Sequence, residues 1–281
     1  MRTLWMRSTL AIAIALLAAA WLAAPEALAA IAFANLGASV GQGAEGEVNP
    51  DINLATDVTS YSNASWTPPT DGLIIAFVLS ARSGGPDTPT MSGNSLTWVQ
   101  IGTTLAIGSG RGLSLFAANA SGATTGATTV SFGANTQLGC IVSFFQATGV
   151  DLSGGVAAAF VQSPSNSGTA TSGSVTLSAA ASSANRPIAA FGHLVNEVST
   201  ERANWTEVDD MHGVGFPRGL ITQWRSDAFE TTASASWTTS ADWGGIAAEL
   251  KAEAAAAASP MTLKGTGLQL KGSALQIKGG T

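Results

Sequence analysis

Two short stretches decide the fold: TTVSF at residues 128–132 and SVTLS at residues 174–178. In each, apolar residues alternate with hydroxyl residues, which is the period of a β-strand that buries one face. Further segments rich in β-branched and aromatic residues lie between clusters of Gly, Pro, Asn, Asp and Ser, the pattern of strands and turns. The predicted strands are 73–80, 96–102, 112–118, 128–132, 139–145, 157–162, 174–178, 188–195, 205–208, 220–225, 233–238 and 244–250.

The order of these segments favours antiparallel sheets. No helical period of useful length appears before residue 250, so alternating strands and helices around a parallel sheet are not expected. Turn clusters such as PPTDG at 68–72 and SGNS at 92–95 end one segment and direct the next. We therefore predict an all-β protein, an antiparallel two-sheet β-sandwich of jelly-roll type, over residues 30–250.

The first 29 residues have the three parts of a secretory signal. Arg2 and Arg7 precede an apolar run at 8–24, and PEALA at 25–29 supplies the small residues Ala27 and Ala29 for cleavage. We predict a cleaved signal helix. An uncleaved membrane anchor is the alternative, although the run is at the short limit for spanning a bilayer. The expected location is extracellular, at the cell surface or in the periplasm, with no membrane contact after cleavage.

Charge is unevenly distributed along the 281 residues. Residues 30–250 hold six Arg and no Lys against 16 acidic residues, a net of −10, whereas all four Lys lie between residues 251 and 278. An acidic body without clustered basic residues argues against a nucleic-acid partner. Cys140 is the single cysteine and lies in an apolar run, so we expect a buried thiol and no disulfide within the chain.

The C-terminal end carries the most specific pattern. An Ala-rich linker at 251–260 is followed at 261–281 by three aligned copies: MTLKGTG, LQLKGSA and LQIKGG. Glycine in every copy disfavours a coiled coil, so we predict three short strands with Lys-Gly turns. Each strand is too short to bury its own apolar face, and the tail therefore needs a docking surface unless it is disordered. The candidate assembly residues are Leu263, Lys264, Leu270, Lys271, Ile277 and Lys278.

Several motifs resemble a module of bacterial secreted proteins and of phage tail or virion-associated proteins. They are SWTPP at 65–69, the segment 73–80, MSGNSLTW at 91–98, LSLFAA at 113–118 and SFFQATGVD at 143–151. The resemblance covers residues 65–151, about a third of the chain, and its spacing is loose. It implies a jelly-roll sandwich and brings no catalytic residue with it.

No catalytic motif is present, and we predict no catalytic residue and no cofactor other than Ca²⁺. Glu207, Asp209, Asp210 and His212 crowd together in what we expect to be a loop beside Trp205. Three interpretations are open: Glu207, Asp209 and Asp210 bind Ca²⁺, the carboxylates pair with His212 as acid and base, or the loop is simply solvated. Asp209, Asp210 and His212 are also candidate ligand-binding residues, whereas Glu207 is a candidate for Ca²⁺ binding only.

Six Trp follow the signal segment, and most are expected in the core, Trp66 and Trp98 above all. Sugar-binding sandwiches present an aromatic ring flat to a sugar face, helped by charged and amide side chains. Trp205 and Trp224, with Arg225, are the candidates for such contacts.

Three functions fit these features. The first is a non-catalytic exported surface protein, carbohydrate-binding or adhesin-like, whose partner is a glycan or another cell-surface component. The second is a structural protein of a surface layer, filament or virion, resembling a tail fibre, that self-associates through residues 261–281. The third is a polysaccharide hydrolase, which would need two carboxylates held across a cleft.

Overall fold

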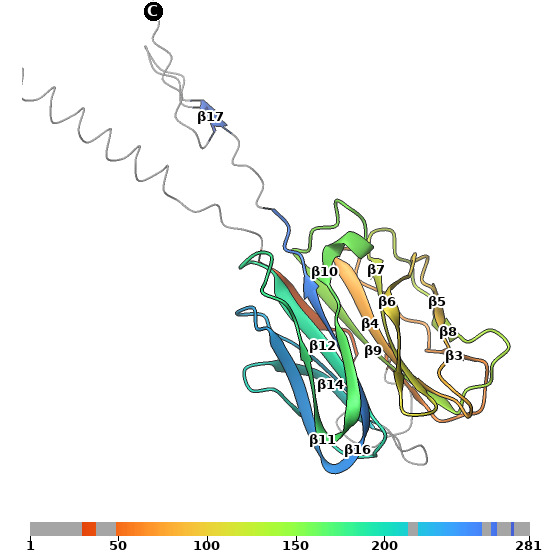
Figure 1. Cartoon of the computed structure of the whole chain (residues 1–281). Helices are drawn as coiled ribbons and strands as arrows, with labels where there is room; N and C mark the ends of the chain where they lie inside the picture. Colours follow the sequence, from red (N-terminus) through yellow and green to blue (C-terminus); the bar gives the residue numbers. More distant parts are fainter. Residues whose placement is uncertain (1–29, 38–48, 213–218, 255–259, 263–270, 273–281) are drawn as a thin grey trace, which may run out of the picture. The chain divides into compact units, whose positions relative to one another are not determined.

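We describe a computed structural model of the chain over residues 30–37, 49–212, 219–254, 260–262 and 271–272. The chain divides into two units, one formed by Ala29–Glu253 and one by the two chain ends. The first unit is built of antiparallel sheets (Figure 1), which confirms the predicted all-β class. Its only described helix is one 3₁₀ turn, η1 (Ala157–Ala159). Within the described residues, no helix is long and apolar enough to span a membrane.

Two larger sheets and one small sheet make up this unit. The first sheet has the order β1 (Ala32–Asn35), β9 (Gly139–Thr148), β4 (Leu73–Ala81), β7 (Arg111–Asn119), β6 (Val99–Ile107), and β2 (Ile52–Leu54) also pairs with β9. The second has the order β10 (Phe160–Gln162), β16 (Thr232–Leu250), β12 (Arg186–His193), β15 (Gly219–Trp224), β14 (Thr206–His212); β11 (Ser165–Thr176) and β13 (Thr200–Glu201) also pair with β16. The small sheet is β3 (Ser60–Ser62), β8 (Thr128–Ser131), β5 (Thr90–Gly93).

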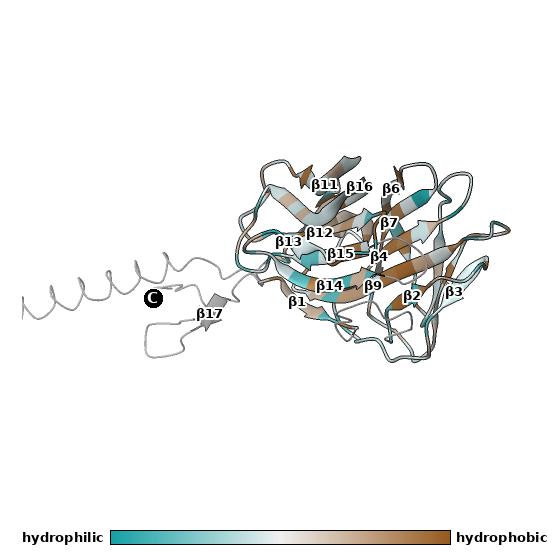
Figure 2. Cartoon of the chain, turned by 90° about the horizontal axis from the view of Figure 1, so that it is seen from below, coloured by the Kyte–Doolittle hydropathy of each residue, from teal (hydrophilic) through white to brown (hydrophobic). Residues whose placement is uncertain are grey.

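Strand β4 shows how the core is arranged, because it is buried on both faces. Leu73, Ile75, Phe77 and Leu79 join a hydrophobic cluster that also contains residues of the second sheet, such as Ile188. Its alternate residues face a second cluster, which includes side chains of the small sheet. Burial of both faces explains why this strand is apolar except for Ser80 instead of alternating (Figure 2).

The alternating stretches behave as predicted. In β8, Thr128 and Val130 are buried while Thr129 and Ser131 are partly exposed. Val175 and Leu177 are buried and belong to a third cluster, on the other side of β12 from the first. Trp66 and Cys140 are also buried, as expected.

Several predicted segments differ from the structure. Residues 96–98 lie between β6 and a turn at residues 94–95, which is closed by a hydrogen bond from Leu96 N–H to Gly93 O, and the strand continues instead to Ile107. Residues 157–159 form the 3₁₀ turn η1. The predicted strands 233–238 and 244–250 are one strand, β16, with a register shift opposite β11 that lets it change direction. Strand β14 extends through the residues predicted as a loop.

Within the second unit, β17 (Pro260–Thr262) and β18 (Lys271–Gly272) pair in antiparallel fashion. Met261 and Thr262 belong to the first repeat and β18 to the second, while Pro260 is the last residue of the linker. Of the predicted assembly residues, Lys271 lies in β18, whereas Leu263, Lys264, Leu270, Ile277 and Lys278 lie outside the described residues.

Candidate functional site

Strand β14 carries most of the candidate residues predicted from the sequence. The prediction that Glu207, Asp209, Asp210 and His212 occupy a loop is wrong, because they pair with β15, with a register shift between Glu207 and Asp209. β14 is the last strand of the second sheet, but Asp209, Asp210 and His212 are buried, so their polar groups need partners within the protein. Asp209 and Asp210 have separate partners: Asp209 bonds to Ser143 of β9 in the first sheet, and Asp210 to Ser199 just before β13.

Asp209 lies at a polar bridge between the two larger sheets. Its side chain accepts hydrogen bonds from the Ser143 hydroxyl and, at 3.1 Å, from Asn35 Nδ2. Ser143 also bonds to Thr222 of β15 at 2.9 Å. Asp209 is 1% exposed, and burial raises the pKa of its carboxyl although these hydrogen bonds oppose the shift. The residue therefore joins two sheets across their shared core.

Asp51 is a second buried carboxyl next to this bridge, and nothing in the sequence pattern identified it. Its Oδ1 accepts a hydrogen bond from Phe144 N at 2.8 Å, in the stretch of β9 between the residues paired with β1 and β2. Its Oδ2 accepts no hydrogen bond within the described residues, and Asp51 is 1% exposed. Burial, with the nearby charge of Asp209, raises the pKa of Asp51 to about 9.

Asp210 belongs to a separate buried cluster. Asp210 Oδ2 accepts from Ser199 N at 2.8 Å, and Ser199 Oγ lies 2.8 Å from His193 Nε2. The His193 ring stacks on Trp237, with ring centres 4.6 Å apart. Burial lowers the pKa of His193 to about 4, so the imidazole is neutral near pH 7. A serine beside a neutral imidazole resembles a nucleophile with its base, but both residues are buried. The contacts described here hold β12 and the segment before β13 together.

The carboxylates predicted to bind Ca²⁺ are spread over different environments. Glu207 is exposed, Asp209 bonds to the first sheet and Asp210 bonds to Ser199. Partial desolvation and the charges of Asp210, Glu201 and Asp209 raise the pKa of Glu207 to about 7. In the part of the chain that the structure describes, no group of three or more His, Cys, Asp or Glu is arranged to hold a metal ion. His212 is buried at the end of β14.

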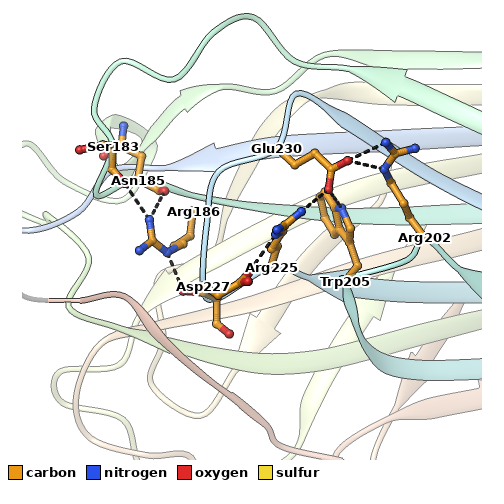
Figure 3. Close-up of polar contacts among 9 residues, drawn as sticks. Ser183, Asn185, Arg186, Arg202, Trp205, Arg225, Asp227 and Glu230 are labelled. Atoms are coloured by element: carbon orange, nitrogen blue, oxygen red, sulfur yellow. Dashed lines mark hydrogen bonds and ion pairs between the residues drawn. The ribbon is translucent and has the colours of Figure 1, made fainter.

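Trp205 and Arg225 meet at a charged cluster centred on Glu230 (Figure 3). Glu230 accepts hydrogen bonds from Trp205 Nε1 at 3.1 Å, Arg202 Nε at 2.6 Å and Arg225 Nη1 at 2.5 Å. Arg225 also pairs with Asp227 at 2.9 Å. Partial burial alone would raise the pKa of Glu230, but these donors outweigh it and lower the pKa. The cluster fastens the segment between β15 and β16 to the residues before β14.

The two candidate Trp rings are both covered. Trp205 is 5% exposed, and Trp224 is 8% exposed. Trp224 stacks on Phe33 with ring centres 5.0 Å apart and an interplanar angle of 10°, and it lies 5.6 Å from Phe145. A ring that stacks on a sugar has to expose a face, and neither ring does so in this structure.

Sequence reasoning missed four residues that organise these clusters: Asp51, Ser143, Ser199 and Glu230. Ser143 interrupts an apolar run, which was a usable signal of a buried polar contact. Asp51 carries no local signal, because its partner Phe144 is 93 positions away. Ser199 and Glu230 have partners six and five positions away, but no alternation or motif marks them.

No family model matches the chain, and no curated protein or solved structure matches it either. The clusters described above are therefore interpreted from their geometry alone.

Proposed function

We propose that this protein is an exported, non-catalytic surface protein that self-assembles through its C-terminal repeat. The proposed location is extracellular or at the cell surface, after loss of residues 1–29. We also propose that its two larger sheets form a jelly-roll-like sandwich, which is supported by the hydrophobic cluster that draws on both.

The observation that carries the proposal is the pairing of β17 with β18. Residues of the first two repeats adopt β structure, with Met261 opposite Lys271. A pair of two- and three-residue strands cannot form a core of its own, so it is stable only when it is added to a larger surface. The basic tail and the acidic, Lys-free residues 30–250 carry opposite charges, which favours association between copies.

The geometry of the predicted ligand residues also supports assembly over sugar binding. Trp224 is covered by Phe33, while Trp205 and Arg225 are engaged by Glu230. Using these residues for a ligand would mean breaking contacts that hold the domain together.

The test is the size of the mature chain, residues 30–281, measured by light scattering beside a chain ending at Ser259. We expect oligomers of the full chain that weaken as salt rises, because exposed charges are screened, and monomers of the shorter chain. A full chain that stays monomeric at low salt would contradict the proposal.

A second candidate is binding of an acidic glycan or another anionic cell-surface component. It is favoured by Arg186 and Arg202, two partly exposed Arg that lie in one region (Figure 3). The side chain of Arg202 is 35% exposed. A glycan array should show binding to acidic sugars that Arg202→Ala reduces, and an array without binding would remove this candidate. Hydrolysis, the third function, is tested by turnover on a panel of polysaccharides.

A further inference from the structure

A half-open cleft of about 470 Å³ lies where β6 begins and β7 ends. The two strands are paired side by side (Figure 1), with Val99 opposite Ala117. Continuing this register places Thr97 opposite Asn119, so alternate residues from both strand ends share one face. The cleft volume is within the range of small-molecule sites, about 300–1,000 Å³. The lining residues are Ser95, Thr97, Val99, Asn119, Ser121 and Val156.

The turn before β6 holds an uncommon backbone conformation. Asn94 and Ser95 have φ values of 56° and 55°, in the left-handed region that residues other than Gly adopt infrequently. Asn94 is buried, and its Nδ2 donates to Gly126 O at 2.9 Å. Its Oδ1 accepts from the Thr128 hydroxyl at 2.6 Å. Such a conformation persists where the surrounding structure fixes it, and here it places Ser95 in the cleft lining.

The polar groups of the lining are held in place but still have free hydrogen-bonding capacity. Ser121 N donates to Asn119 Oδ1 at 2.9 Å, which fixes the side-chain amide. Ser95 Oγ lies 2.8 Å from Thr124 Oγ1. In the described part of the chain, Asn119 Nδ2 and the Thr97 hydroxyl make no hydrogen bond to another residue. The cleft therefore offers an amide donor and a hydroxyl that can both donate and accept.

The rest of the lining is apolar and uncharged. Val99 and Val156 are partly buried and pack against the hydrophobic cluster that draws on both larger sheets. None of the lining residues is charged, although residues 30–250 carry a net charge of −10. A ligand with a phosphate, carboxylate or ammonium group would find no opposite charge in this lining. The cleft thus suits a neutral ligand that combines hydroxyl groups with C–H surface.

We propose that this cleft binds one residue of an uncharged glycan. A sugar ring presents hydroxyls at its edge, which match Asn119 and Thr97, and C–H groups on its faces, which match the two Val side chains. The lining shares no residue with Trp205, Trp224 and Arg225, the set predicted from the sequence. Because each neutral hydrogen bond contributes little net free energy, a single sugar should bind weakly, with a Kd on the order of 1 mM.

Saturation-transfer NMR of the mature chain with glucose, galactose, mannose and N-acetylglucosamine tests this inference. We expect binding of at least one of these sugars, with an affinity that NaCl does not change. Asn119→Asp should weaken it about fivefold, because Oδ1 can still accept from Ser121 N while the amide donor is lost. Thr97→Val keeps the side-chain shape without the hydroxyl and should have a similar effect. Asn204→Asp and Thr171→Val make the same changes at exposed positions outside the cleft and should leave the affinity unchanged.

Further variants cover the case in which either cleft variant fails to fold. Ser121 is exposed at the rim, so Ser121→Trp should keep the fold, checked by circular dichroism, and abolish binding by filling the cleft. A chain ending at Ser259 should bind as well as the mature chain, which separates this inference from the proposed assembly.

Three results would overturn the inference. One is the absence of saturation transfer to all four sugars together with no binding on an array of neutral glycans. Another is an unchanged affinity in Asn119→Asp, Thr97→Val and Ser121→Trp, because the sugar would then bind elsewhere. The third is binding restricted to acidic sugars and lost in Arg202→Ala, which would favour the anionic-glycan candidate instead.

Discussion

Replacing Trp224 with Ala tests whether this ring is part of the core or part of a ligand site. Trp224 is 8% exposed, and its ring centre lies 5.0 Å from that of Phe33, on which it stacks, and 5.6 Å from that of Phe145. Large-to-small replacement of a buried aromatic residue costs about 3–5 kcal/mol, and the lost aromatic pair accounts for roughly 0.5–1.5 kcal/mol. We therefore expect Trp224→Ala to lower the free energy of unfolding by about 4 kcal/mol. Trp224→Phe should cost less, because Phe keeps a ring against Phe33.

Urea unfolding followed by circular dichroism measures these differences. The midpoint should fall in the Ala variant while the dependence on urea stays constant, which shows that stability has changed and not the compactness of the unfolded chain. A loss below about 1 kcal/mol would refute the reasoning, since it would show that the ring contributes no more than an ordinary surface side chain. Trp224 would then have to be reconsidered as a ligand contact.

Three further predictions concern charged and titrating groups. The pKa of Asp51 is about 9 in the folded protein, against 3.8 in the unfolded chain. Its contribution to the free energy of unfolding is therefore full below about pH 4 and declines as the pH rises towards 9. Urea unfolding of Asp51→Asn should depend less on pH than that of the unmodified protein, and an unchanged pH dependence would contradict this. The lowered pKa of His193, about 4, predicts the opposite: stability is lost as pH falls from about 6.5 to 4, because the unfolded chain takes up a proton first. His193→Gln should reduce that loss, and equal acid sensitivity in the two proteins would count against it. Glu230→Gln should lower the free energy of unfolding by about 1–2 kcal/mol, because it weakens the hydrogen bonds to Arg202, Arg225 and Trp205 in a partly exposed cluster. Asp227→Asn is the control: the Asp227 side chain is 69% exposed, so this change should alter the free energy of unfolding little.

Local sequence patterns were sufficient to predict the all-β class and several strands. The alternation in residues 128–132 and the apolar run of 73–80 depend on side chains a few positions apart, so local periodicity was enough to predict β8 and most of β4. The same local reasoning failed where burial changes within a strand. Residues 209–212 look like a polar loop, but they form part of β14, because their polar groups find partners in distant segments.

The grouping of the buried polar residues depends on how the strands pack in three dimensions. Asp51 and Asp209 are 158 positions apart in the sequence, and they bond to neighbouring residues of β9 because β9 and β14 contribute to one hydrophobic cluster. Trp224 could be a ligand contact or a core residue by sequence, and the position of Phe33 settles its exposure. The physical reason is that strand pairing and alternation are local, whereas the desolvation of a carboxyl or an indole depends on what the rest of the chain places against it.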